Sequence, residues 1–314
     1  MKTIIAVFFA VILSATAEWV EIGETVTASV KPGWPGKTGG ITCDPSSGEV
    51  FLVIPDQGIW KSSDQGKTFA RADKGEIGGR CETGFALNFD PRGQRLMCFM
   101  IYGNCAGTTD GGKSWAKWKT NHLDFGAVDW EGSGKAMLGL RHEKGGMLTL
   151  STDGGATWTD IQGGFKSLGL FDTQTLVASK GDGILRSTDS GATWTKVSEY
   201  KPSGFVVRVF KGVGYWTSDN GLLVSRDKGA TWNLLGGAVN AFHGPYFGKD
   251  ETHLVVVGKN GFMESTDSGK TWKQVAPLPP NYDTGMVGPN YAWDLKANIF
   301  YASSMGKPAY KFVR

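Results

Sequence analysis

The sequence predicts an all-β protein in which one structural unit is repeated around a ring, and three observations support this. Glycine contributes 46 of the 314 residues, roughly twice the usual share, which disfavours long helices because glycine destabilises them. Aromatic residues make up 12% of the chain. One eight-residue element occurs six times, at steps of 46, 43, 36, 38 and 40 residues. A period of about 40 residues with several short strands per unit is typical of a β-propeller blade.

The repeated element has the form Ser/Thr-x-Asp-x-Gly-x-Thr/Ser-Trp/Phe. Its copies begin at Ser62, Thr108, Ser151, Ser187, Ser225 and Ser265. The central Asp can accept hydrogen bonds from its own turn, the Gly permits a positive φ, and the hydroxyl groups can tie the two ends together. The final aromatic residue can fill the space between neighbouring sheets. We therefore interpret the element as a structural turn rather than a catalytic site.

The six elements resemble the Asp-box of sialidase-like (BNR-repeat) β-propellers, and the resemblance spans nearly the whole chain after its N-terminal segment. It implies that each element joins the third and fourth strands of a blade, on the face opposite the active site. It says little about activity, because sialidases, xyloglucan hydrolases, certain polysaccharide lyases, sortilin-type receptors and photosystem assembly factors all carry this element.

The spacing predicts seven blades, although only six elements are present. The predicted blades begin at Gly39, Thr83, Phe125, Phe165, Phe205, Val239 and Gly285. The last segment supplies three strands, at 291–294, 299–303 and 310–313. We expect residues 19–23 to add the missing outer strand, so that both termini share one blade and no sheet edge is left open. A six-bladed ring is the alternative.

The N-terminus predicts export. Residues 4–13 are apolar, follow Lys2 and precede small residues. Ten residues are too short to cross a bilayer core of about 30 Å, but they suit a secretory signal peptide at 1–17. A hydrophobic strand of the mature protein is the alternative. Residues 18–314 are then a single secreted domain, which we expect to be monomeric. The net charge of +3 argues against nucleic-acid or membrane partners.

Export favours two disulfides among the four cysteines. Three pairings are open, and we prefer Cys81 with Cys105 and Cys43 with Cys98. There is no Cys-x-x-Cys pair and no His/Cys cluster, so the sequence predicts no zinc site and no cofactor. Oxygen atoms lining a central channel could hold a structural Ca²⁺, but no dedicated calcium loop is present.

A propeller commonly binds ligands on the face that carries the turns between second and third strands and the connections between blades. The most distinctive such turn is Arg141-His142-Glu143-Lys144. We expect His122 and Asp124 on the same face. The predicted catalytic residues are His142, Arg141, Tyr102, Arg208 and His243. The predicted substrate-binding residues are Arg80, Glu82, Asn104, Tyr200, Tyr246 and Asp283.

The activities implied by the resemblance fit the sequence unequally. Sialidases carry an early Arg-Ile-Pro motif, whereas residues 51–55 read Phe-Leu-Val-Ile-Pro. Xyloglucan hydrolases of this fold form their cleft between two tandem propellers, and this chain has room for one. The chain is more similar in size to the secreted single-domain propeller lyases, which use His, Arg and Tyr at the channel mouth.

We therefore expect a secreted enzyme that cleaves a uronate-containing polysaccharide, by β-elimination rather than hydrolysis. Elimination needs a cation for the uronate carboxylate, a base for the C5 proton and an acid for the leaving oxygen. Arg141, Arg80 or Arg208 could supply the cation. His142 or His243 could be the base, and Tyr102 or Tyr246 the acid. A noncatalytic propeller that binds glycans or proteins is the alternative.

Overall fold

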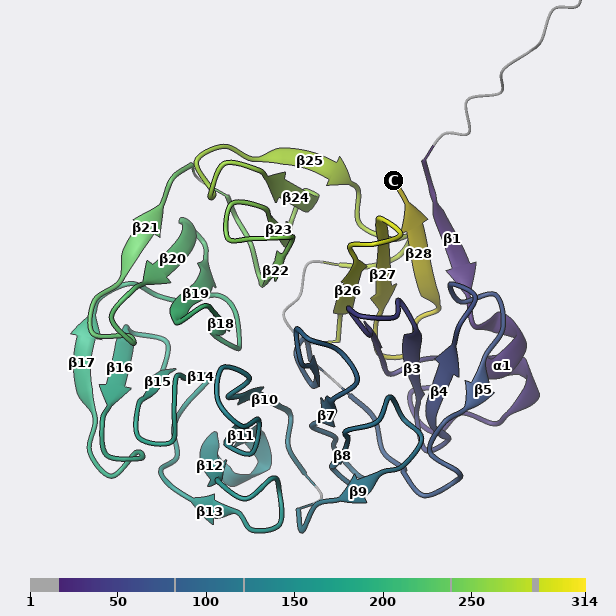
Figure 1. Ribbon diagram of the computed structural model, residues 1–314, viewed down its shortest axis with the longest axis horizontal. Helices are drawn as coiled ribbons and strands as arrows, with labels where there is room; N and C mark the ends of the chain where they lie inside the picture. Colours follow the sequence, from purple (N-terminus) through teal and green to yellow (C-terminus); the bar gives the residue numbers. More distant parts are fainter. Residues whose placement is uncertain (1–16, 82, 121, 238, 284–287) are drawn as a thin grey trace, which may run out of the picture.

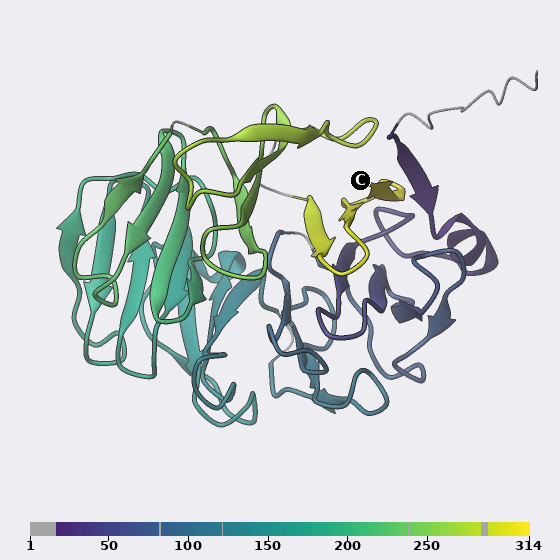
Figure 2. The same ribbon diagram turned by 45° about the horizontal axis from the view of Figure 1, so that its top comes forward.

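Seven four-stranded antiparallel sheets form a ring in the computed structural model, which confirms the predicted seven-bladed β-propeller (Figure 1). The structure describes residues 17–314 except 82, 121, 238 and 284–287. The predicted signal peptide therefore lies outside the described residues, apart from Ala17. The sheets stand side by side around the ring when the molecule is tilted (Figure 2).

In blades 1–6 the strands run in sequence order from the inner to the outer edge. Blade 1 contains β2 (Gly40–Cys43), β3 (Val50–Ile54), β4 (Gly58–Ser62) and β5 (Ala70–Arg71). Blade 2 contains β6 (Leu87–Phe89), β7 (Leu96–Cys98), β8 (Ala106–Thr108) and β9 (Ala116–Lys117). Blade 3 contains β10 (Phe125–Val128), β11 (Met137–Arg141), β12 (Met147–Ser151) and β13 (Thr159–Asp160). Blade 4 contains β14 (Ser167–Leu170), β15 (Leu176–Ser179), β16 (Ile184–Ser187) and β17 (Thr195–Ser198).

Three further blades complete the ring. Blade 5 contains β18 (Arg208–Phe210), β19 (Val213–Ser218), β20 (Gly221–Ser225) and β21 (Asn233–Leu235). Blade 6 contains β22 (His243–Phe247), β23 (Leu254–Gly258), β24 (Gly261–Ser265) and β25 (Lys273–Ala276). Blade 7 contains β26 (Asn290–Asp294), β27 (Ile299–Ser303) and β28 (Ala309–Val313), and its outer strand is β1 (Trp19–Ile22).

The N-terminal strand closes the ring as predicted. β1 pairs antiparallel with β28, with Trp19 opposite Phe312. The Trp19 ring lies 5.3 Å from that of Phe312 and 5.5 Å from that of Phe262 in blade 6, and its Nε1 donates to the Pro277 carbonyl at 2.9 Å. One side chain thus joins the two termini to a neighbouring blade. The short helix α1 (Glu24–Ser29) follows β1, and in the part of the chain that the structure describes no helix is long and apolar enough to span a membrane.

The six repeated elements, named the repeat turns below, connect the third and fourth strands of blades 1–6. In the first, Asp64 accepts the Thr68 backbone N–H at 2.9 Å and the Thr68 hydroxyl at 2.7 Å, while Ser62 Oγ accepts the Gly66 N–H at 2.8 Å. The aromatic residues then pack between blades: the Trp158 ring of blade 3 lies 5.5 Å from that of Trp118. The polar side chains of the repeat turns therefore form hydrogen bonds within their own turns, as their residue types predict.

The cysteines differ from the prediction, because no disulfide forms among Cys43, Cys81, Cys98 and Cys105. Cys43 lies in an apolar cluster of blades 1 and 7, whereas Cys98 belongs to a cluster that spans blades 1, 2 and 3. The predicted pair of Cys43 with Cys98 is therefore separated. Cys105 Sγ donates instead to the Met100 carbonyl at 3.2 Å. Burial raises the pKa of Cys105 to about 12, which keeps it a thiol.

Candidate functional site

The meander topology places two kinds of connection on opposite faces of the ring. Turns between second and third strands and links between blades lie on one side, named the connection face. The repeat turns and the turns between first and second strands lie on the other, named the repeat face. The turn at 142–144, between β11 and β12, therefore shares the connection face with residues 118–120 and 122–124, which lead into β10.

Asp124 and His142 form the best-defined polar pair on the connection face. Asp124 is 5% exposed and ends the link before β10. Its Oδ2 accepts the His142 backbone N–H at 2.8 Å, and its Oδ1 contacts Nδ1 of the same residue. The carboxylate therefore fixes both the turn and the imidazole orientation. The His142 side chain is 56% exposed, so Asp124 orients the imidazole through Nδ1 while much of the side chain remains accessible to solvent.

A second imidazole lies beside this pair. The His122 ring is 5.6 Å from the His142 ring, and His122 Nε2 contacts Glu143 Oε1. Glu143 Oε1 also lies 3.3 Å from His142 Nε2. One carboxylate thus bridges the two histidines, which are twenty positions apart in the sequence.

These four residues could also hold a divalent metal ion. One ligand atom from each of His122, Asp124, His142 and Glu143 lies within 4.8 Å of the others. Two imidazoles with two carboxylates are ligands that zinc accepts. These four residues show no metal-ligand spacing in the sequence, because they come from two segments that only the fold of blade 3 brings together. The contacts of Asp124 and Glu143 with the two histidines also explain why these four side chains lie together.

Aromatic and cationic side chains extend this cluster across blades 1 and 2. The Tyr102 ring lies 5.0 Å from His122, and the Arg80 guanidinium carbon lies 4.5 Å from Tyr102 and 4.6 Å from Trp34. Trp34 and Tyr102 are 66% and 60% exposed. Trp34, Arg80, Tyr102, His122 and His142 thus form one continuous series, named the connection-face row.

Arg141 is bound at the blade rim instead of facing this row. Its guanidinium donates to Asp160 at 2.9 Å and to the Thr120 hydroxyl at 2.9 Å, and its side chain is 14% exposed. Lys144 also binds Asp160, at 3.0 Å. Burial alone would raise the pKa of Asp160, but these two cations lower it overall. Asp160 therefore neutralises much of the positive charge expected from the turn.

The remaining predicted catalytic residues, Arg208 and His243, lie on inner strands. Arg208 is in β18 with its guanidinium carbon 4.5 Å from the Phe85 ring, and Tyr246 packs on the same ring at 5.8 Å. His243 begins β22, is 4% exposed, and lies 5.1 Å from the Tyr291 ring. Burial raises the pKa of Tyr246 far above its ordinary range. The predicted catalytic set is thus divided: His142 and Tyr102 belong to the connection-face row, Arg208 and His243 lie on inner strands, and Arg141 is bound at the blade rim.

The other predicted binding residues are scattered. Asn104 lies in the turn that carries Tyr102, and its Nδ2 is 3.5 Å from the Glu76 carbonyl. Tyr200 packs against the core of blades 4 and 5. Asp283 is exposed on the link between blades 6 and 7. Glu82 lies outside the described residues. Sequence reasoning missed Trp34, although an aromatic residue between Gly33 and Pro35 in a polar link was a usable signal.

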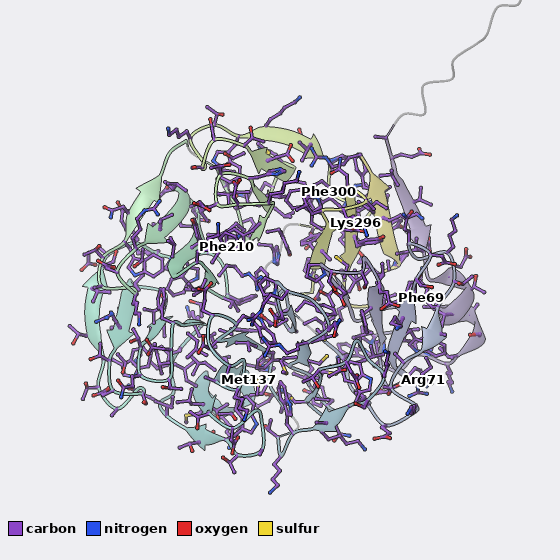
Figure 3. All side chains as sticks on the ribbon, viewed as in Figure 1. Phe69, Arg71, Met137, Phe210, Lys296 and Phe300 are labelled. Carbon is purple, nitrogen blue, oxygen red and sulfur yellow. The ribbon has the colours of Figure 1, made fainter. Side chains whose placement is uncertain are left out.

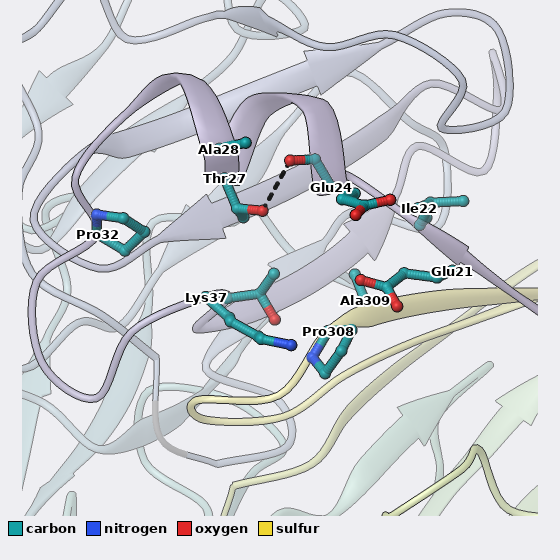
Figure 4. A pocket seen from close by; sticks show the side chains of 10 residues that line it. Glu21, Ile22, Glu24, Thr27, Ala28, Pro32, Lys37, Pro308 and Ala309 are labelled. Carbon is teal, nitrogen blue, oxygen red and sulfur yellow. Dashed lines mark hydrogen bonds between the residues drawn. The ribbon is translucent and has the colours of Figure 1, made fainter.

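A separate cavity of about 320 Å³ lies where β1 and α1 meet β28 (Figure 4). Glu21, Glu24 and Lys37 bring charge to it, and Pro308 and Ala309 form part of its wall. None of the predicted site residues lines it. The cavity follows from the way the N-terminal segment joins the ring.

Comparisons with known proteins show the fold. No protein-family model matches the chain, and a search of curated proteins finds no match. YCF48 from Cyanidioschyzon merolae has a TM-score of 0.54 at 14% identity, covering 95% of this chain and 99% of that one. A structure titled YCF48 bound to D1 peptide has a TM-score of 0.53 at 13% identity, covering 96% of each chain.

Two longer proteins are also similar. An ancestral GH74 enzyme has a TM-score of 0.51 at 15% identity, covering 95% of this chain and 46% of that one. PorZ, a surface component of the type-IX secretion system of Porphyromonas gingivalis, has a TM-score of 0.57 at 12% identity, covering 94% and 38%. At these identities the likeness concerns architecture alone. The architecture and these neighbours together place the chain among the seven-bladed β-propellers.

Proposed function

We propose that the chain is a secreted enzyme that binds an acidic polysaccharide along the connection-face row and cleaves it beside a uronate by β-elimination. The observation that carries the proposal is the Asp124–His142 pair, a buried carboxylate that orients an exposed imidazole, with His122 between this imidazole and the Tyr102 ring. Exposed Trp34 and Tyr102 rings offer flat apolar surfaces against which sugar rings can pack. The row crosses three blades, so it could contact several sugars.

The proposed reaction assigns one task to each group. His142 Nε2 takes the C5 proton, because Nδ1 faces Asp124. The electron pair of the C5–H bond forms the C4=C5 double bond as the C4–O bond breaks. The Tyr102 hydroxyl donates its proton to the departing oxygen. The Arg80 guanidinium balances the uronate carboxylate, which lowers the cost of removing the C5 proton.

The test uses a panel of polysaccharides that contain glucuronate, iduronate or galacturonate. Elimination produces an unsaturated uronate that absorbs ultraviolet light, whereas hydrolysis produces reducing ends without that absorbance. We expect ultraviolet-absorbing products from the unaltered protein and a loss on the order of 100-fold or more in His142→Ala. His253→Ala is the matched control, because His253 pairs with Glu264 at 2.9 Å in blade 6, away from the row. Full activity of His142→Ala contradicts the assigned base.

A noncatalytic role in peptide or glycan binding is the second candidate. The structural neighbour that carries a D1 peptide favours it, since a propeller of this architecture binds a peptide there. Binding of a polysaccharide without either kind of product would support this candidate over the enzyme. Hydrolysis, the chemistry suggested by the GH74 neighbour, is recognised by reducing ends alone.

A further inference from the structure

The central channel contains a cavity that reaches the repeat-face ends of the inner strands. Its volume is about 360 Å³, within the range of small-molecule sites. Inner strands of blades 1, 2, 5, 6 and 7 line it, together with Pro45, Pro91, Lys249 and Leu295 from the repeat-face ends of blades 1, 2, 6 and 7. No residue of the connection-face row lines it. Side chains project from the inner strands into the middle of the ring, and Phe210 of this cavity is labelled (Figure 3).

Within the described part of the chain, Arg208 lines this cavity without a carboxylate partner. Among the described residues, its Nε is buried with no hydrogen-bond partner, and its only polar contact is a long one of 3.5 Å from Nη1 to Asn88 Oδ1. Burial lowers the pKa of Arg208, but an arginine remains charged in proteins. A partly desolvated guanidinium without an anion is costly, and a bound carboxylate would relieve this cost.

The rest of the lining suits the same class of ligand. The described lining residues include the cations Arg208 and Lys249 and no Asp or Glu. Phe210 and Phe247 form a stacked wall with ring centres 4.5 Å apart. The Nε1 of Trp293, another lining residue, is a second buried donor with no hydrogen-bond partner within the described chain. The cavity therefore combines positive charge and unused donors with aromatic walls.

We propose that this cavity binds a small carboxylate with an apolar body, with the guanidinium of Arg208 paired to the carboxylate. The site is separate from the proposed polysaccharide site in position and in residues. It assigns Arg208 to a second ligand instead of to the elimination reaction.

Benzoate is the probe, benzamide is its neutral counterpart, and calorimetric titration gives both affinities. Charge-assisted pairing is expected to make benzoate bind about tenfold or more tightly than benzamide. Arg208→Gln should weaken benzoate by a similar factor and leave benzamide unchanged. Arg186→Gln is the control, because Arg186 donates to the Lys228 carbonyl on the outer part of blade 4.

The comparison of benzoate with benzamide uses the unaltered protein, so it holds even if Arg208→Gln fails to fold. Three outcomes would overturn the proposal: equal affinity for the two probes, no binding of benzoate, or unchanged benzoate affinity in a folded Arg208→Gln. His142→Ala should bind benzoate normally. Loss of polysaccharide cleavage with retained benzoate binding then separates the two sites.

Discussion

Asp124 holds His142 at two points: one carboxylate oxygen accepts the His142 backbone N–H at 2.8 Å, and the other contacts the imidazole Nδ1. This relationship joins the link before blade 3 to the β11–β12 turn. It fixes where Nε2 lies and is the structural basis of the proposed catalytic base.

Asp124→Asn should lower kcat far more than it changes KM. The amide can still occupy the same space, but it no longer favours the tautomer with a basic Nε2. We expect a loss in kcat on the order of 100-fold, measured by the ultraviolet assay at saturating polysaccharide. Asp129→Asn is the control, because Asp129 caps a repeat-face turn by accepting the Gly132 N–H at 2.8 Å. Equal effects of the two substitutions would remove the orienting role of Asp124.

Zinc should inhibit the proposed elimination activity by occupying the four-residue cluster. His122, Asp124, His142 and Glu143 offer a zinc-compatible donor set, and a bound ion would withdraw His142 from proton transfer. Activity is expected to fall with added Zn²⁺ and to return with EDTA, and His122→Ala should need more Zn²⁺ for the same inhibition. Activity that requires a metal and is lost with EDTA would show instead that the cluster is a metal centre.

Trp34→Ala should weaken polysaccharide binding with little effect on the chemical step. Trp34 is 66% exposed and stacks on Arg80, so its loss removes a surface for the sugar without opening the core. We expect KM to rise several-fold while kcat stays within about twofold, since one aromatic contact contributes about 1 kcal/mol. Leu234→Ala removes an exposed apolar side chain from β21 and should change neither constant. A fall in kcat alone would place Trp34 in the reaction instead of in binding.

The aspartates of the repeat turns should make the stability of the protein fall at acid pH. Hydrogen bonds from Thr193 and Ser187 lower the pKa of Asp189 from 3.8 to about 2, and Asp153 and Asp267 are similar. A carboxyl group whose pKa falls on folding stabilises the native state above its ordinary pKa, and this contribution is lost as the pH drops through the folded value. Scanning calorimetry should therefore show the Tm falling most steeply between about pH 4 and pH 2.

A single substitution isolates this effect. Asp189→Asn should lower the Tm at neutral pH, because the amide cannot accept both Thr193 bonds. The difference from the unaltered protein should narrow as the pH approaches 2, where Asp189 itself becomes protonated. A difference that stays constant with pH would mean that the turn is stabilised by something other than the ionised carboxylate.

The sequence predicted the architecture well because the repeat encodes it directly. The turns that begin at Ser62 and its equivalents are determined within eight residues, and the period sets the blade boundaries. Even the pairing of residues 19–22 with the last strand followed from the need to close the ring. The connection face was predictable for the same reason, since a meander alternates its turns between two faces.

The site itself could be predicted only in part, because its contacts join distant segments. The sequence marked the 141–144 turn but could not show that Asp160, on the outer strand of the same blade, would bind Arg141. Nor could it show whether Arg208 points into the channel or toward the connection face. The cysteines illustrate the same limit: export favours pairing, but only the packing of blades places Cys43 and Cys98 in different clusters.

The most direct test of the proposed function is proton NMR of the ends formed when the protein cleaves a glucuronate-containing polysaccharide. We predict a vinylic C4 proton on the new non-reducing ends with the unaltered protein and with Asp129→Asn, and a signal on the order of 100-fold weaker with His142→Ala after the same time. New ends that carry a saturated uronate, or vinylic ends that His142→Ala forms at the full rate, would contradict elimination by the histidine that Asp124 orients.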